Sequence, residues 1–284
     1  MDHLGVGYLS VFGLPPVEFV HLAADLGCRC MSIFLRGLPL KQLRYPTFSL
    51  KRDAALRDAV RAALREREVT ITLADGFLIA PGADIHSLCA DLDVVADLGA
   101  PLINVVSIDP DREHTFDQLG VLTELAAARG LQAVVEPVPA MPIGDLPTAL
   151  AAIQHVGRPD LRLLVDTMHL VRSGSGAAEL AAIDPVRIGY AQINDTTLRP
   201  RMGDYLQEAM FERLAPGEGE LPLLDILCAL PPDIVIEVEV PQRSLALAGV
   251  GPFDRLRPCV DAARRLLELA QGQAGSRTGN PAAR

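Results

Sequence analysis

Four segments in the second half of the chain decide its fold: LQAVVEP (131–137), LRLLVDT (161–167), RIGYAQI (187–193) and DIVIEVEV (233–240). Each is a short run rich in Val, Leu, Ile or Ala, which is typical of a buried β-strand. Each also carries polar side chains at or near its carboxyl end. The pattern predicts neighbouring strands of one buried sheet whose ends share a polar edge.

The same alternation of strands and helices runs back to the N-terminus. Earlier strands are predicted at 3–9, 28–34, 68–74 and 100–106, and amphipathic helices at 15–27, 51–68, 84–99 and 115–130. With a last helix at 252–271, these rounds favour a closed (β/α)8 TIM barrel over an open doubly wound sheet. Residues 1–271 are predicted to form a single domain. Residues 272–284, rich in Gly, Ala and polar residues, are predicted to be a disordered C-terminal tail.

Composition and charge narrow the classes of partner. The net charge of -10 over 284 residues, with no basic stripe, argues against nucleic acid. No apolar run approaches the roughly 18 residues of a membrane span, and the N-terminus lacks a secretory signal pattern. We therefore expect a cytoplasmic protein with no membrane contact. The five cysteines have no CxxC spacing and are interpreted as buried thiols.

Polar residues that end apolar strands are the candidates for chemistry, because catalytic groups of a barrel project from the carboxyl ends of its strands. These residues are Glu136, Asp166 with His169 after it, Gln192 with Asp195 after it, and Glu237 and Glu239. One such carboxylate alone can be a capped or salt-bridged loop residue. Several on neighbouring strands are costly to bury unless they bind a cation. Carboxylate and amide oxygens suit Mg²⁺, Mn²⁺ or a similar ion.

The connection 194–220 after the seventh strand is unusually long, and long βα loops of a barrel lie over the active face. This connection contains three arginines, Arg199, Arg201 and Arg213. Each either binds a substrate phosphate or carboxylate or is a solvated loop cation. We select Arg201, Asp195 and His169 as the predicted substrate contacts. The first four βα loops are expected to determine which substrate binds.

The motifs VVEP, LLVDTMH, IGYAQINDT, RLAPGEGELPL and IEVEVP resemble the xylose isomerase-like barrels, especially the sugar phosphate isomerase/epimerase group. Hydroxypyruvate isomerases, ketose epimerases and inosose dehydratases are relatives within that resemblance. It implies a metal site of Glu136, Asp166, Gln192 and a glutamate of the eighth strand. Glu239 is preferred and Glu237 is the alternative, since both lie on one face of the strand. Some relatives have histidine where this chain has Gln192.

The resemblance further implies one divalent ion, with Mn²⁺ expected and Mg²⁺, Co²⁺ or Zn²⁺ as alternatives. An isomerase or epimerase of a sugar or keto-polyol would work through a metal-stabilised enediolate, with Glu136 and Glu239 shuttling the proton and His169 bonding a substrate oxygen. The alternatives are a metal-dependent dehydratase of an inosose- or dehydroshikimate-like substrate and a non-catalytic sugar-binding barrel. A homo-oligomer is compatible with the resemblance, since related barrels often pair.

Overall fold

The fold was determined from a computed structural model that describes residues 3–38 and 40–278. Eight parallel strands close into one barrel in chain order, β1 to β8, which confirms the predicted (β/α)8 barrel. The strands are β1 (Leu4–Val6), β2 (Cys30–Phe34), β3 (Thr70–Ile79), β4 (Leu102–Ser107), β5 (Gln132–Val135), β6 (Leu161–Asp166), β7 (Ile188–Ile193) and β8 (Ile236–Val238). The barrel closes where β1 pairs with β8, with Gly5 opposite Glu237.

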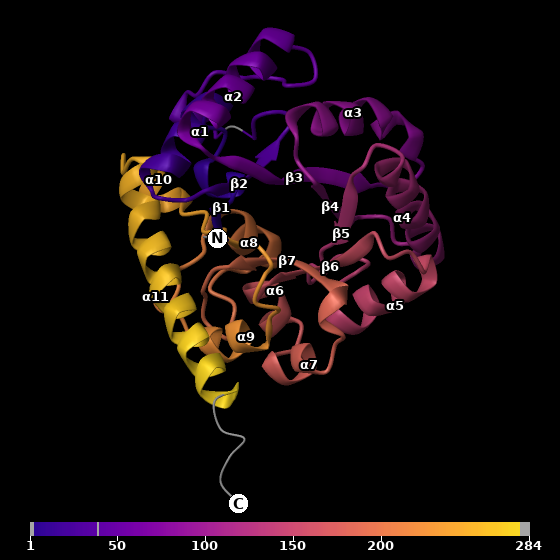
Figure 1. Ribbon diagram of the computed structural model, residues 1–284, viewed down its shortest axis with the longest axis vertical. Helices are drawn as coiled ribbons and strands as arrows, with labels where there is room; N and C mark the ends of the chain where they lie inside the picture. The colour runs from indigo at the N-terminus through magenta and orange to yellow at the C-terminus, as the bar shows by residue number, and fades with distance from the viewer. Residues whose placement is uncertain (1–2, 39, 279–284) are drawn as a thin grey trace, which may run out of the picture.

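Helices surround the barrel, as Figure 1 shows. The longer ones are α1 (Pro16–Asp25), α2 (Ala54–Arg67), α3 (Cys89–Leu98), α4 (Arg112–Ala127), α5 (Leu146–Val156) and α11 (Pro252–Thr278). The shorter ones are α6 (Thr167–Arg172), α7 (Ala177–Ala181), α8 (Tyr205–Phe211), α9 (Leu223–Ala229) and α10 (Arg243–Leu247). Single 3₁₀ turns occur at η1 (Tyr8–Val11), η2 (Lys41–Leu43), η3 (Ile85–Leu88) and η4 (Pro185–Arg187).

Aspartates fix the starts of several helices. Asp53, Asp111 and Asp145 precede α2, α4 and α5, and each side chain accepts a hydrogen bond from a backbone N–H of the first turn. Such caps satisfy donors that a helix start leaves unpaired, each with a stabilisation of about 1 kcal/mol. These caps fix where the three helices begin after their preceding loops.

The interior of the barrel consists of an apolar layer with a polar layer beyond it. The apolar layer contains Leu73, Leu102, Val134, Leu164 and Tyr190, one from each of β3 to β7. Successive inward-facing residues of a strand are two positions apart. The next inward positions toward the carboxyl ends are polar: Asp75, Asn104, Glu136, Asp166 and Gln192. One step along each strand therefore changes the barrel from a packed core to a buried polar layer.

The C-terminal helix α11 packs along the outside of the barrel against α9, α1 and α10 (Figure 1). It runs to Thr278 and so continues into the segment that was predicted to be a disordered tail from 272 onward. Extending an existing helix avoids the unfavourable nucleation step, which explains why this polar sequence continues the helix. The remainder of the predicted tail, 279–284, lies outside the described residues.

The connection 194–220 contains one helix, α8, which is held down by a buried ion pair. Arg172 of α6 donates to Glu208 of α8 over 2.9 Å, and Thr196 donates to the same carboxylate over 2.7 Å. The predicted long loop is thus an ordered element beside the carboxyl ends of the strands. Within the described ranges no helix is both long and apolar enough to cross a membrane.

Candidate functional site

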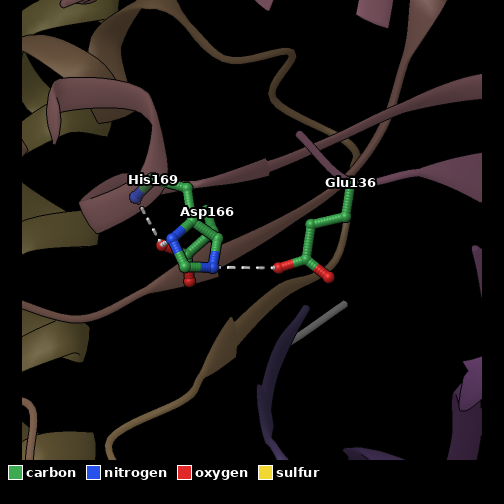
Figure 2. Close-up of side chains that lie close together, drawn as sticks. All are labelled: Glu136, Asp166 and His169. Atoms are coloured by element: carbon green, nitrogen blue, oxygen red, sulfur yellow. Dashed lines mark hydrogen bonds and ion pairs between the residues drawn. The ribbon is translucent and has the colours of Figure 1, made fainter. Parts of the chain in front are cut away.

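Three ligand-type side chains meet at the carboxyl ends of β5 and β6. Glu136 follows β5, Asp166 ends β6, and His169 lies one turn into α6, so that their ligand atoms all fall within 4.8 Å of one another. His169 Nε2 lies 3.4 Å from Glu136 Oε1, the contact drawn in Figure 2. All three are buried. This grouping can hold a metal ion, and it unites two predicted ligands with the predicted substrate contact.

Asp166 is fixed from several sides. One oxygen accepts from the His169 backbone N–H over 2.9 Å, because Asp166 is the N-cap of α6. The other accepts from Asn194 Nδ2 over 2.7 Å and from Arg213 Nη1 over 2.6 Å. Burial is the largest single influence and would raise the pKa of Asp166, but the charges of Arg213 and His169 and the hydrogen bonds from both residues together outweigh it, so the pKa lies below its ordinary value. Asp166 is therefore an ionised, oriented carboxylate.

Arg213 connects the carboxylates of β6 and β8. The same Nη1 that bonds Asp166 lies 3.0 Å from Glu239 Oε2, and the Arg213 side chain is almost fully buried. Burial raises the pKa of Glu239 well above its ordinary value, against the lowering effect of Arg213. The long connection thus delivers a cation to the two carboxylates from outside the barrel.

Gln192 separates the two glutamates of β8. Its Nε2 donates to Glu239 Oε1 over 3.0 Å and to Glu237 Oε1 over 3.3 Å, while its buried Oε1 has no hydrogen-bond partner among residues 3–38 and 40–278. Glu237 lies deeper and accepts from the Tyr190 hydroxyl over 2.9 Å. A Cβ on Gly7 would lie 2.7 Å from Glu237 Oε1, so a larger residue here would displace this carboxylate. Glu239, not Glu237, is the glutamate that shares Arg213 with Asp166.

His169 is oriented by a residue of the long connection. The Tyr205 hydroxyl lies 2.6 Å from His169 Nδ1. Burial raises the pKa of Tyr205 far above its ordinary value, so the phenol keeps its proton and is able to donate a hydrogen bond to Nδ1. The other ring nitrogen, Nε2, then carries the hydrogen and faces Glu136.

Two residues that the sequence analysis did not consider extend the polar layer to β3 and β4. Asn104 Nδ2 donates to Glu136 Oε2 over 2.6 Å and to Asp75 Oδ1 over 3.2 Å. Burial raises the pKa of Asp75 to about 7, and the charge of Glu136 adds to the shift. A polar residue inside the runs LADGF (73–77) and LINVV (102–106) was the available signal, since period two places both residues inside the barrel.

Two predicted substrate contacts lie away from this group. Asp195 accepts backbone N–H bonds from Thr196, Gly217 and Leu221 over 2.8 to 3.1 Å, which ties down the turn at 215–221. A Cβ on Gly219 would collide with Asp195 Oδ1, which explains the glycine in this turn. Arg201 is exposed, and its backbone N–H donates to Glu208 Oε2 over 3.0 Å. The structure brings neither residue to the cluster.

The donor set fits a divalent ion. Carboxylate oxygens of Glu136, Asp166 and Glu239 are hard ligands, and Gln192 Oε1 is a buried acceptor that no donor reaches in the described part of the chain. Cation binding would give that oxygen a partner and offset the repulsion between the carboxylates. His169 lies in the same cluster, where the hydrogen on its Nε2 makes it a donor toward Glu136 or a substrate oxygen.

Comparison with known proteins identifies the family. A family model described as Xylose isomerase-like TIM barrel matches residues 20–267. The chain belongs to this family. No curated protein sequence matches it.

Solved structures share the xylose isomerase-like barrel at low sequence identity. The IolI protein with a bound zinc atom is 17% identical, with a TM-score of 0.76 over 95% of this chain and 99% of that one. A D-psicose 3-epimerase determined in the presence of D-fructose is 13% identical, with a TM-score of 0.70 over 94% and 99%. A xylose isomerase-like TIM barrel/4-hydroxyphenylpyruvate dioxygenase fusion protein is 18% identical, with a TM-score of 0.76. The match covers 99% of this chain but only 45% of that fusion protein. At these identities the likeness shows the fold.

Proposed function

We propose that this protein is a divalent-metal-dependent isomerase or epimerase of a sugar or keto-polyol. The observation that carries the proposal is the buried meeting of Glu136, Asp166 and His169 at one end of the barrel, beside an unpartnered Gln192 oxygen. Isolated carboxylates are not buried together without a cation or a chemical task. Epimerase and zinc-bound structures with the same fold are consistent with this function.

We assign the ion to Glu136, Asp166, Gln192 and Glu239, with Mn²⁺ as the expected metal. When bound, a divalent ion would supply Lewis-acid polarisation of the substrate carbonyl and so acidify the C–H bond on the carbon next to it. Glu239 is favoured over Glu237, because Glu239 and Asp166 share Arg213 whereas Glu237 is engaged by Tyr190 deeper in the barrel.

Proton transfer is assigned to Glu136 and Glu239. They come from β5 and from the residue after β8, so that substrate held between them presents opposite faces to the two carboxylates. His169 Nε2–H lies beside Glu136 and is placed to donate to a substrate oxygen, since Tyr205 occupies the other ring nitrogen. Asn104 fixes the second oxygen of Glu136, which holds its first oxygen toward the site.

Metal content is the first test. Elemental mass spectrometry measures the metal content of four proteins: wild type, Glu136→Ala, Asp166→Ala and the control Asp233→Asn. Wild type and the control should hold about one Mn or similar ion per chain. The Glu136→Ala and Asp166→Ala variants should lose that ion. Asp233 is an exposed carboxylate that precedes β8 at the opposite end of the barrel. Absence of metal in wild type after Mn²⁺ addition would overturn the metal assignment and favour a non-catalytic sugar-binding barrel.

Product mass tests the reaction. In ordinary water the proposal requires a product of the same mass as its keto-polyol substrate. In deuterated water, exchange of the transferred proton with solvent should make the product one mass unit heavier. Glu136→Gln should abolish turnover while the protein stays folded. Loss of 18 mass units, the mass of one water molecule, would contradict isomerisation and assign the protein to the dehydratases.

A further inference from the structure

A cavity of about 690 Å³ opens beside the site, on the side of β2 and β3. This volume is within the range of ligand pockets, roughly 300–1,000 Å³. Asp75 is one of its lining residues and is bonded through Asn104 to Glu136. Two side chains therefore connect the cavity to the proposed proton-transfer group. A substrate held at the metal ligands has this cavity next to it.

Most of the cavity wall is apolar. The wall includes Phe34, Leu35, Phe48, Phe77, Leu78 and Leu88. The Phe34 and Phe48 rings pack on Tyr8, with centroids 5.6 and 6.2 Å from the tyrosine ring, so this part of the wall is built on the core. A sugar presents hydroxyls all around and would leave them without hydrogen-bond partners against such a wall. The wall instead fits an apolar segment.

The connection that carries this wall is closed on itself. Arg36 and Ser49 form an antiparallel bridge, and the Leu50 N–H donates to the Leu35 carbonyl over 2.8 Å. A Cβ on Gly37 would lie only 3.2 Å from Phe48 Cε1. These contacts place the two ends of the connection side by side, with basic residues on both.

Three basic residues, Arg36, Lys51 and Arg52, lie at the edge of the cavity. Lys51 is neutralised by Asp91 over 2.5 Å. Arg36 and Arg52 are exposed, and within residues 3–38 and 40–278 neither has an acidic group within 4.0 Å. Two unpaired arginines beside a cavity stand out in a protein with a net charge of -10. Guanidinium groups bind carboxylates and phosphates through paired hydrogen bonds.

We propose that the substrate carries a carboxylate or phosphate that Arg36 and Arg52 bind, joined to its reacting carbons by an apolar segment that occupies the Phe34–Phe48–Phe77 cavity. The inference deepens the proposed function, on which it rests, by naming the substrate class. It also moves the anion-binding role from Arg201, the residue expected from the sequence, to the first half of the barrel. There the β2 and β3 connections determine specificity.

Isothermal titration calorimetry tests this inference without turnover. The probes are 3-phenylpropionate, phenyl phosphate, the uncharged 3-phenylpropionamide and acetate, which lacks the apolar segment. Wild type should bind at least one of the two aromatic anions about tenfold more tightly than the amide or acetate. Tighter binding of the carboxylate or of the phosphate identifies which anion the site prefers. Binding should weaken with added salt, because the arginines are exposed.

Variants assign the effect to the two arginines. Arg36→Gln/Arg52→Gln should remove most of the tenfold preference for the anion, whereas Arg44→Gln should retain it. Arg44 is exposed in the same connection but does not line the cavity. Equal binding of anion and amide by wild type, or an unchanged preference in the double variant, would overturn the inference.

Metal content of the same preparations separates this inference from the proposed function. A protein that holds one ion but does not prefer the anions contradicts only the substrate class. A protein that prefers the anions, loses that preference in the double variant and holds no metal contradicts only the metal-dependent reaction.

Discussion

The Tyr205 hydroxyl lies 2.6 Å from His169 Nδ1, and we infer that the phenol donates in this contact, which leaves the hydrogen of His169 on Nε2. Tyr205 belongs to α8 in the long connection, whereas His169 belongs to α6. The helices α6 and α8, which β7 separates in the chain, thus act together to direct the Nε2–H group of His169 toward Glu136. The tautomer of the histidine is therefore a property of the assembled barrel.

Tyr205→Phe should leave the fold intact and weaken the preference for the Nε2–H tautomer by about fivefold, as expected for loss of a hydrogen bond of about 1 kcal/mol. Nitrogen-15 NMR of labelled histidine reports the tautomer directly. Tyr45→Phe, in the β2 connection, is the matched control and should leave the His169 signals unchanged. Identical His169 shifts in wild type and Tyr205→Phe would contradict the assigned donor.

Arg213→Met should destabilise the metal-free protein by about 3 kcal/mol, because it leaves the buried carboxylates of Asp166 and Glu239 without their shared cation. Chemical unfolding measures the loss. Arg257→Met, which breaks an exposed pair with Asp261, should change stability by about 0.5 kcal/mol or less. Added Mn²⁺ should stabilise Arg213→Met more than wild type, since the ion supplies the missing positive charge. Equal stabilisation of both proteins would argue against a metal site at these carboxylates.

Asp75→Asn should make the stability of the metal-free protein less sensitive to a rise in pH from about 4 to about 7. Because burial raises the pKa of Asp75 to about 7, the unfolded chain ionises this group near pH 4 while the folded protein retains the proton. Stability of wild type therefore falls as the pH rises from about 4 to about 7. The variant, which has no such proton, should avoid a loss of about 4 kcal/mol.

Urea unfolding in the presence of EDTA at pH 5 and pH 8 measures this difference. Asp233→Asn, at an exposed carboxylate, is the control and should show the same pH dependence as wild type. If the free energy of unfolding changed by the same amount between pH 5 and pH 8 in wild type and in Asp75→Asn, the raised pKa of Asp75 would be refuted.

Asp195→Ala should destabilise the fold by about 2 kcal/mol without loss of metal, because three backbone N–H groups around the turn at 215–221 lose their acceptor. Thermal unfolding and elemental analysis of the same sample check both parts. Loss of the ion at unchanged stability would instead make Asp195 part of the metal site.

The sequence by itself determined the barrel and the strand ends at which polar residues gather. Alternation of Val- and Leu-rich runs with amphipathic helices is local information, and all eight strands formed in the predicted order. The carboxylates Glu136 and Asp166 were visible because they interrupt apolar runs. Period two along each strand then fixed which side chains face inward.

Only the tertiary structure decided which of these groups meet, and which residues from other elements join them. Arg213 reaches Asp166 across 47 positions of the chain, and Asn104 reaches Glu136 across 32. Glu237 and Glu239 are two positions apart and therefore face the same side of the strand. Only their different depths in the barrel show which of them lies beside Arg213 and Asp166. Asp195 has the sequence context of a site residue but caps a backbone turn. Such pairings depend on how consecutive strands lie side by side and on the path of the connection after β7, and no local sequence pattern encodes either.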